Sequence, residues 1–209
     1  MMMKLAGLLG ALTLSIGLAA AVVALFFLDA APTPTLTANM VTGNLVAKVT
    51  VVEYASFTCP HCARFHAEVF SKIKPEYIDT GLIRFEYSEV YFDRFGLWAA
   101  MLARCGGEMR YFGISDVLFE KQTEWAAAET PAQVVENLKT IGRSVGLEDA
   151  AMDICLKDQV MAEALVAQFE TNMARDMVEG TPTFFINGVM HSNMSYEEMK
   201  ALLDAELAK

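Results

Sequence analysis

The chain has 209 residues, a mass of 23.0 kDa, a formal net charge of −10 and a pI near 4.8. This length accommodates one or two domains. The excess of Asp and Glu argues against nucleic acid as a partner, because an extended basic surface is needed to neutralise phosphates. Hydrophobic residues make up 54% of the chain, and their excess is concentrated in residues 1–31.

Residues 5–28 contain no charged side chain and are followed by Asp29. As a helix this segment would extend about 36 Å, which is enough to cross a bilayer. The same segment is also typical of a cleaved export signal, with small residues at Ala19 and Ala21. Residues 1–35 are therefore predicted to be a signal peptide or a membrane anchor, followed by a linker. Either form places the remainder of the chain in the periplasm, released or tethered to the inner membrane.

The first third of the folded part has the pattern strand, helix, strand. Residues 49–55 form a β-branched apolar run that only Glu53 interrupts, as expected of a strand buried on both faces. Apolar residues at steps of four predict a helix that begins at Pro60 and is closed by Pro75. A second strand is predicted over residues 82–87.

Residues 93–178 have helix-favouring composition, and four or five helices are expected there. A short strand is predicted over residues 183–186, followed by an Asn-Gly turn at residues 187–188. Ser195 and Glu198 form a capping box that starts the last helix. Strands at both ends with helices between them indicate one sheet domain with a helical insertion.

The candidate chemistry lies in the sequence Cys-Pro-His-Cys, which starts the first helix. Cys59 at the helix N-cap faces unsatisfied N–H groups and the positive end of the helix dipole, and both favour a thiolate. The imidazole of His61 adds a further donor nearby. Cys62 lies three residues before Phe65 and therefore faces the core. Since a stabilised thiolate favours the reduced pair, this pair is expected to give its disulfide away.

Other interpretations of Cys59 and Cys62 have less support in the sequence. Haem attachment requires His directly after the second Cys, where this chain has Ala63. A zinc site would need two more ligands, such as Cys105 and Cys155. A purely structural bond between Cys59 and Cys62 would close too short a loop to gain much entropy. A copper- or zinc-handling protein that uses these cysteines with nearby Met or His is retained as a minority hypothesis.

Residues 53–62, Glu-Tyr-Ala-Ser-Phe-Thr-Cys-Pro-His-Cys, together with residues 180–188, Gly-Thr-Pro-Thr-Phe-Phe-Ile-Asn-Gly, resemble the DsbA family of thiol:disulfide interchange proteins. The similarity extends over most of the chain. It implies an α/β, thioredoxin-like fold interrupted by an all-helical insertion. The thioredoxin-like domain would comprise residues 36–92 and 179–209, and the insertion residues 93–178.

The resemblance also implies roles for the motif. Cys59 matches the attacking cysteine and Cys62 the buried resolving one, while Pro60 and His61 match the dipeptide that tunes them. The family's activity is the oxidation of newly exported proteins, so the expected substrates are reduced, unfolded exported proteins. Re-oxidation by a quinone-linked membrane partner of the DsbB type is implied, with no bound cofactor or metal.

Thr181 and Pro182 match the loop whose proline is cis and faces the disulfide. Such a loop exposes backbone with which an extended substrate can pair. Thr181 stands where the best-known member of the family has valine, so an isomerase or reductase of the same fold stays open as an alternative.

Glu53 shares a strand face with Val51 and Ala55, and it is expected to be buried beneath Cys62. A carboxyl group in that place could accept and return the proton of Cys62. The alternative is a solvated Glu on an exposed strand face.

Cys105 and Cys155 both fall in the helical block and are predicted to form a structural disulfide. The loop of about fifty residues would contribute about 4 kcal/mol by the chain-entropy estimate. A second redox pair or two free thiols remain open. His66 and His191 carry no partner signature and are expected at the surface or in satisfied packing, and the 13 Met residues are interpreted as core or peptide-binding surface rather than as copper ligands.

Overall fold

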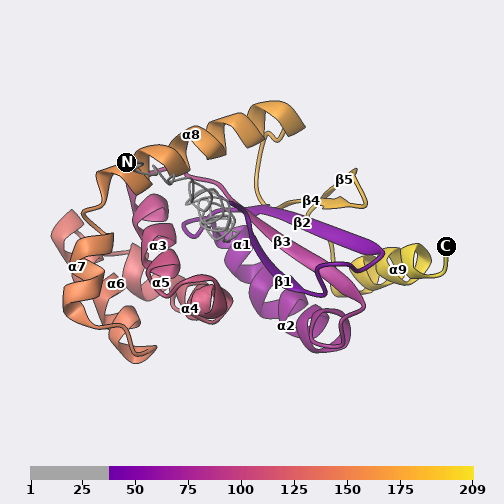
Figure 1. Ribbon diagram of the computed structural model, residues 1–209, viewed down its shortest axis with the longest axis horizontal. Helices are drawn as coiled ribbons and strands as arrows, with labels where there is room; N and C mark the ends of the chain where they lie inside the picture. Colours follow the sequence, from indigo (N-terminus) through magenta and orange to yellow (C-terminus); the bar gives the residue numbers. More distant parts are fainter. Residues whose placement is uncertain (1–37) are drawn as a thin grey trace, which may run out of the picture. The chain divides into compact units, whose positions relative to one another are not determined.

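The computed structural model describes residues 38–209 (Figure 1). The predicted signal or anchor at residues 5–28 lies outside them. Within the described part, no helix has both the length and the apolar character that a membrane crossing requires.

A mixed sheet organises the described chain. Its strands lie in the order β1-β3-β2-β4-β5. The bounds are Met40–Gly43 for β1, Val49–Ala55 for β2, Ile83–Glu89 for β3, Thr183–Ile186 for β4 and Val189–Ser192 for β5. β2 and β3 are parallel, whereas the other neighbouring pairs are antiparallel. The central strand β2 therefore delivers the Cys-Pro-His-Cys motif at its carboxyl end.

The strand β1 was not predicted from the sequence. It has four residues and pairs with β3 at the edge of the sheet. A strand this short carries too few residues for an alternating pattern, and its position depends on the partner strand.

A single helical run follows β2 and contains two π-helical turns. Its parts are α1 (Pro60–Phe65), η2 (His66–Phe70), α2 (Ser71–Ile73) and η3 (Lys74–Ile78). The prediction that Pro75 closes this helix is wrong, because the run continues to Ile78. In the last turn the N–H of Asp79 donates to the carbonyl of Lys74, five residues back, at 2.8 Å. A π turn is wider than an α turn and leaves room for a proline ring. The hydrogen bond of this turn runs from Asp79 to Lys74, so the N–H that Pro75 lacks is not required.

The helical block contains six helices, more than the four or five that the sequence predicts. They are α3 (Arg94–Cys105), α4 (Glu108–Glu120), α5 (Gln122–Ala126), α6 (Pro131–Ser144), α7 (Asp149–Cys155) and α8 (Gln159–Asp176). The difference comes from α5 and α7, which have five and seven residues. Helices of one or two turns are too short to show a clear periodicity.

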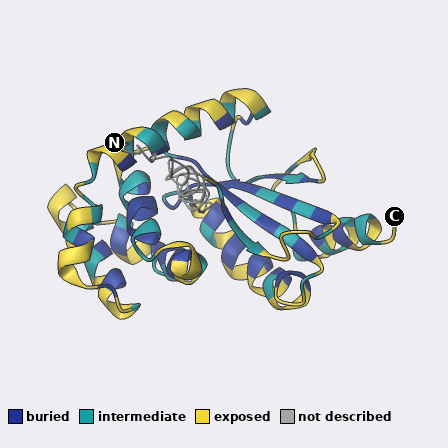
Figure 2. Cartoon of the chain, in the orientation of Figure 1, coloured by how far each residue is buried: buried dark blue, intermediate teal, exposed yellow. Residues whose placement is uncertain are grey.

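The sheet is covered on both faces (Figure 1). On one face, Val51 and Phe85 pack with Phe65 of α1 and with Leu203 of α9 (Tyr196–Leu207). The predicted capping box of Ser195 and Glu198 starts α9. On the other face, Tyr54 contacts side chains of α8. Figure 2 shows the central strands mostly buried, as expected for a sheet between two layers.

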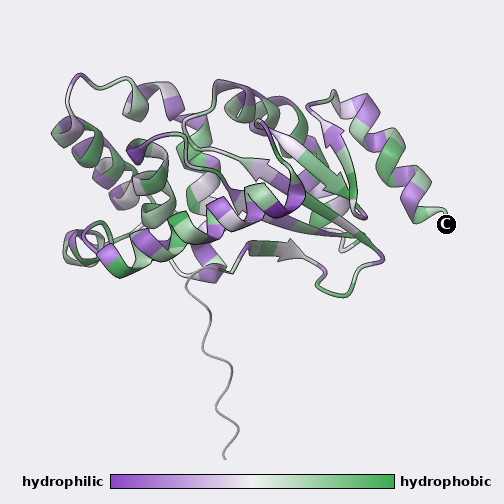
Figure 3. Cartoon of the chain, turned by 90° about the horizontal axis from the view of Figure 1, so that it is seen from above, coloured by the Kyte–Doolittle hydropathy of each residue, from purple (hydrophilic) through white to green (hydrophobic). Residues whose placement is uncertain are grey.

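The helical block shares its core with the carboxyl ends of the parallel strands β2 and β3. One cluster of buried residues joins Phe57, Cys62 and Tyr87 to Leu118 and Phe119 of α4. Figure 3 shows hydrophobic and hydrophilic residues alternating along the helices, as expected where one side of a helix faces a core. The insertion is thus packed directly against the motif.

Gly43 at the end of β1 provides a test of the edge strand. Its φ is +82°, and a Cβ built there would lie 2.4 Å from the carbonyl oxygen of Ile83. Gly43→Ala should therefore lower the free energy of unfolding by about 1–3 kcal/mol. Urea denaturation measures this change.

Gly113 in α4 is the matched control, since nothing lies within 4 Å of an added Cβ. Gly113→Ala should raise the stability by up to about 1 kcal/mol through helix propensity. Equal effects of the two substitutions would contradict the placement of β1.

Candidate active site

The two cysteines of the motif have the positions that the sequence predicts, at the start of α1. Cys59 is the N-cap residue, with extended backbone angles, and Pro60 is the first helical residue. Both cysteines are free thiols in this structure. Cys59 is 8% exposed and Cys62 is fully buried. Only Cys59 is therefore open to attack from outside, through a small window.

The ionisation of Cys59 is governed first by its neighbour. The side-chain hydrogen bond with Cys62 lowers the pKa of Cys59 to about 5, and Thr181 and the backbone N–H groups of Cys62 and His61 act in the same direction. Burial opposes this shift but does not outweigh it. The imidazole of His61, predicted to be a further donor, is not among the groups that lower this pKa. His61 is exposed and acts through its backbone N–H.

Cys62 shows the opposite behaviour. Burial raises the pKa of Cys62 far above its ordinary value, and the hydrogen bond with Cys59 and the negative charge of Glu53 add to the effect. Between these two pKa values, a range that includes neutral pH, the reduced pair therefore holds a single proton, which stays on Cys62.

The Thr181–Pro182 peptide is cis and lies beside the attacking sulfur. The Sγ of Cys59 is 3.5 Å from the carbonyl oxygen of Thr181. Backbone at this position borders the Cys59 window, where an extended peptide could pair with it.

Two residues of the helical block form hydrogen bonds with the loop that leads into α1, and neither was predicted from the sequence. Gln122 donates from Nε2 to the carbonyls of Phe57, at 2.7 Å, and Cys59, at 3.0 Å. Asp93 accepts from the Thr58 hydroxyl at 2.8 Å and also caps α3. Neither residue belongs to a motif, so no local signal could have identified them.

Glu53 is fully buried in β2, as predicted, and it has a partner that was not predicted. Its Oε2 lies 3.1 Å from Nε2 of His66. The His66 ring is 8% exposed and stacks on Phe119 with 3.9 Å between ring centroids. His66 follows Cys62 by four residues, which places both on one side of the helical run. That spacing was the signal available in the sequence.

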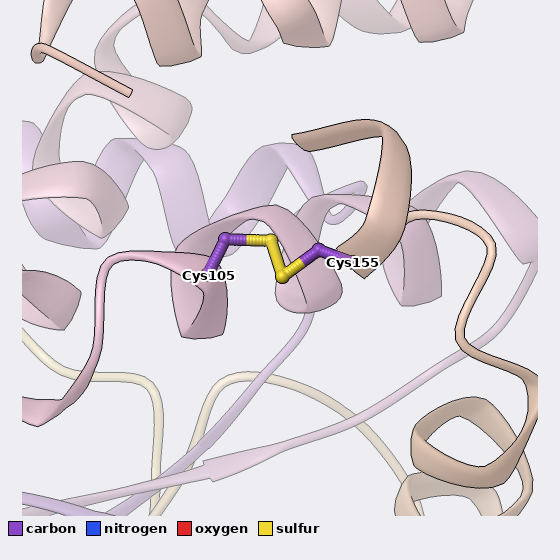
Figure 4. The surroundings of a disulfide bond; sticks show 2 residues. All are labelled: Cys105 and Cys155. Carbon is purple, nitrogen blue, oxygen red and sulfur yellow. A yellow bond between two sulfur atoms is a disulfide. The ribbon is translucent and has the colours of Figure 1, made fainter. Parts of the chain in front are cut away.

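Cys105 and Cys155 are joined in a disulfide, with a Cα–Cα distance of 5.9 Å (Figure 4). They are the last residues of α3 and α7. Because their sulfurs are bonded to each other, they do not complete a zinc site with Cys59 and Cys62. Within residues 38–209, no cluster of three or more His, Cys, Asp or Glu residues could hold a metal ion.

The fold and the paired cysteines are those of a thioredoxin-like protein. The thioredoxin family model matches residues 35–205, and the chain belongs to this family.

Within that family the similarity is to DsbA proteins. The structure of alpha-DsbA1 from Wolbachia pipientis has a TM-score of 0.76 and 27% sequence identity, over 85% of this chain and 93% of that one. Disulfide bond formation protein D of Bacillus subtilis is 27% identical over 83% of this chain and 79% of its own length. The predicted resemblance to the DsbA family is confirmed.

A Rickettsia bellii protein whose name provisionally assigns it to the protein-disulfide oxidoreductases is 35% identical over 79% of this chain. The match covers 63% of the Rickettsia bellii protein. This chain therefore spans less than two thirds of the length of that relative.

Titration of the reduced protein tests the unequal ionisation of the pair. Alkylation of Cys59 by iodoacetamide should follow pH with a midpoint near 5. The folded pKa lies below the ordinary thiol value of about 8.5. The contribution of Cys59 to the stability of the reduced protein should therefore be fully present at about pH 8.5 and be lost as pH falls toward 5, whereas the raised pKa of Cys62 lowers the stability above about pH 8.5.

The control is Cys59→Ser, in which this part of the pH dependence of unfolding should vanish. A midpoint of alkylation near 8.5, as in a free cysteine, would contradict the site geometry.

Proposed function

We propose that this protein is a DsbA-like protein-disulfide oxidoreductase that introduces disulfide bonds into newly translocated proteins. The observation that carries the proposal is the single proton of the reduced pair, with the pKa of Cys59 lowered to about 5 and that of Cys62 raised. The names of the relatives in Rickettsia bellii, Bacillus subtilis and Wolbachia pipientis support the same activity.

In the proposed reaction, a substrate thiolate attacks the Cys59 sulfur of the oxidised pair. The bond between Cys59 and Cys62 breaks, and Cys62 leaves with the electron pair and takes up a proton. A second substrate thiolate then attacks the substrate sulfur of the mixed disulfide. The substrate disulfide forms, and Cys59 leaves as a stabilised thiolate. The substrate is oxidised by two electrons, and the active-site pair is reduced.

The direction of transfer follows from the stability of that thiolate. A pKa lowered by about four units corresponds to about 5.5 kcal/mol in favour of the reduced pair. For a two-electron couple this raises the reduction potential by about 120 mV over that of a pair with an ordinary thiol. Such a pair donates its disulfide to most protein dithiols.

The proton of Cys62 is handled by Glu53 in this proposal. The Glu53 carboxyl group is buried, and its charge acts directly on Cys62. It supplies the proton when Cys62 leaves the disulfide and accepts it when Cys62 attacks.

The proposed location is the periplasm, and the support for it is the apolar segment at residues 5–28. Re-oxidation is assigned to a quinone-linked membrane protein of the DsbB type. The disulfide between Cys105 and Cys155 is proposed to be structural and to remain in place during the cycle, since it lies in the helical block and joins α3 to α7.

The decisive experiment mixes the oxidised full chain with a reduced, unfolded substrate and follows disulfide formation. We expect rapid oxidation and no activity in Cys59→Ser. In Cys62→Ser, with Cys59 first converted to its glutathione disulfide, the substrate thiolate should displace glutathione and a mixed disulfide with the substrate should accumulate. Equilibration with glutathione should give a potential about 120 mV above that of a pair without a stabilised thiolate. A pair that glutathione leaves oxidised would assign the protein to the reductases instead.

Substitution of Glu53 tests its role with a group of the same shape. Glu53→Gln should slow the attack of Cys62 on a mixed disulfide by on the order of 100-fold, because the amide cannot accept the proton. Stopped-flow fluorescence measures that step. The matched control is Glu170→Gln on the exposed side of α8, which should leave the rate unchanged. An unchanged rate in Glu53→Gln would remove Glu53 from the mechanism.

A further inference from the structure

A cavity of about 540 Å³ lies beside α1, on the side of the helical block. Its wall includes residues of the helical run and of the block: Pro60, Ala63, His66, Asp116, Phe119 and Thr123. The volume is enough for several water molecules. Water in the cavity would therefore reach the side of α1 at Ala63, the residue next to Cys62 in the chain.

His66 lies between this cavity and the buried carboxyl group of Glu53. Its Nε2 is 3.1 Å from Oε2 of Glu53, and the residue also forms part of the cavity wall. Within the described residues, its other ring nitrogen, Nδ1, has no hydrogen-bond partner although it is buried. Stacking on Phe119 fixes the plane of the ring. One imidazole thus contacts the carboxyl group with one nitrogen, and its second nitrogen is not engaged by any group of the described residues.

We propose that His66 is a positioning residue that passes protons between the cavity and Glu53, and through Glu53 to Cys62. The inference rests on the thiol–disulfide chemistry of the proposed function. It gives Cys62 a proton route separate from the small window at Cys59. An imidazole suits this task, because it can bind a proton at one nitrogen while releasing one from the other.

The proton balance can be followed in both directions. When a substrate thiolate opens the disulfide, Glu53 gives its proton to Cys62. His66 then gives the proton on Nε2 to Glu53, and Nδ1 takes one from the cavity. When Cys62 attacks a mixed disulfide, each transfer runs in reverse and one proton leaves to the cavity. No electrons pass through His66, since they move only between sulfur atoms.

The ring is surrounded by groups that can modulate its charge. They are Glu53 on β2, Tyr87 on β3, Asp116 and Glu120 on α4, and Lys74 on η3. Burial raises the pKa of Asp116, while the positive charges of His66 and Lys74 oppose that shift.

The test separates two steps of exchange between the reduced protein and oxidised glutathione. In the first step Cys59 attacks and forms a mixed disulfide, which requires no proton from Cys62. In the second step Cys62 attacks Cys59 and expels glutathione, which requires Cys62 to lose its proton. His66→Gln keeps a side chain that can hydrogen-bond to Glu53 but cannot relay a proton. It should slow the second step about tenfold and leave the first step within twofold of the original.

His191→Gln is the matched control, since His191 lies on β5 away from this cavity. Both steps should be unchanged in it. A second variant, His66→Ala, leaves space for an added small molecule. Imidazole should restore the second step, while pyrrole, which has the same size and no basic nitrogen, should not.

Equal slowing of both steps in His66→Gln, an unchanged second step, or equal rescue by pyrrole would overturn the proposal and leave His66 a purely structural role. The outcome is independent of the oxidase proposal, because glutathione exchange occurs with any reactive pair. A protein that fails to oxidise unfolded substrates but shows the selective loss in His66→Gln would retain the relay and lose the oxidase function.

Discussion

The reduced active site has two sulfur atoms and one proton, and the rest of the structure determines where that proton stays. Cys62 is fully buried, so ionising it would place a charge in the core, and burial raises its pKa. Cys59 lies at the N-terminal end of α1 and accepts the hydrogen bond of Cys62. This division requires Cys59 to be the N-cap of α1, with Pro60 as the first helical residue. The geometry of a single helix start therefore sets both the reactivity of one cysteine and the inertness of the other.

The helical block takes part in the site rather than only covering it. Gln122 holds two carbonyls of the loop before α1, and Phe119 packs against His66. The buried cluster around Phe57 and Cys62 includes residues of α4. If the amide of Gln122 were removed, the two carbonyls would stay buried without a donor, which costs about 1–3 kcal/mol for each unsatisfied group. The insertion and the thioredoxin-like part thus share one active site, although they are separate stretches of sequence.

Sequence patterns were sufficient where structure is local. The strand β2 follows from a β-branched apolar run, the start of α1 from a proline in the first turn, and the start of α9 from a capping box. The end of the first helix was not predictable, because Pro75 is accommodated only by a π turn. His66 and Gln122 were missed for a different reason. The spacing of four residues from Cys62 places His66 on the right side of the helix, but its partner Glu53 is 13 residues away. The carbonyls that Gln122 holds are more than 60 residues away, and no pattern in a short window encodes such contacts.

The two cysteine pairs differ in their place on helices, and this difference bears on which disulfide is given away. Cys59 lies at a helix N-terminus, where the dipole and free N–H groups stabilise a thiolate. Cys105 and Cys155 end α3 and α7, where the helix dipole is negative and disfavours a thiolate. Reduction of that bond would release two sulfurs with no helical stabilisation of their charge. The same electrostatic rule thus favours the dithiol in one pair and the disulfide in the other, within one chain.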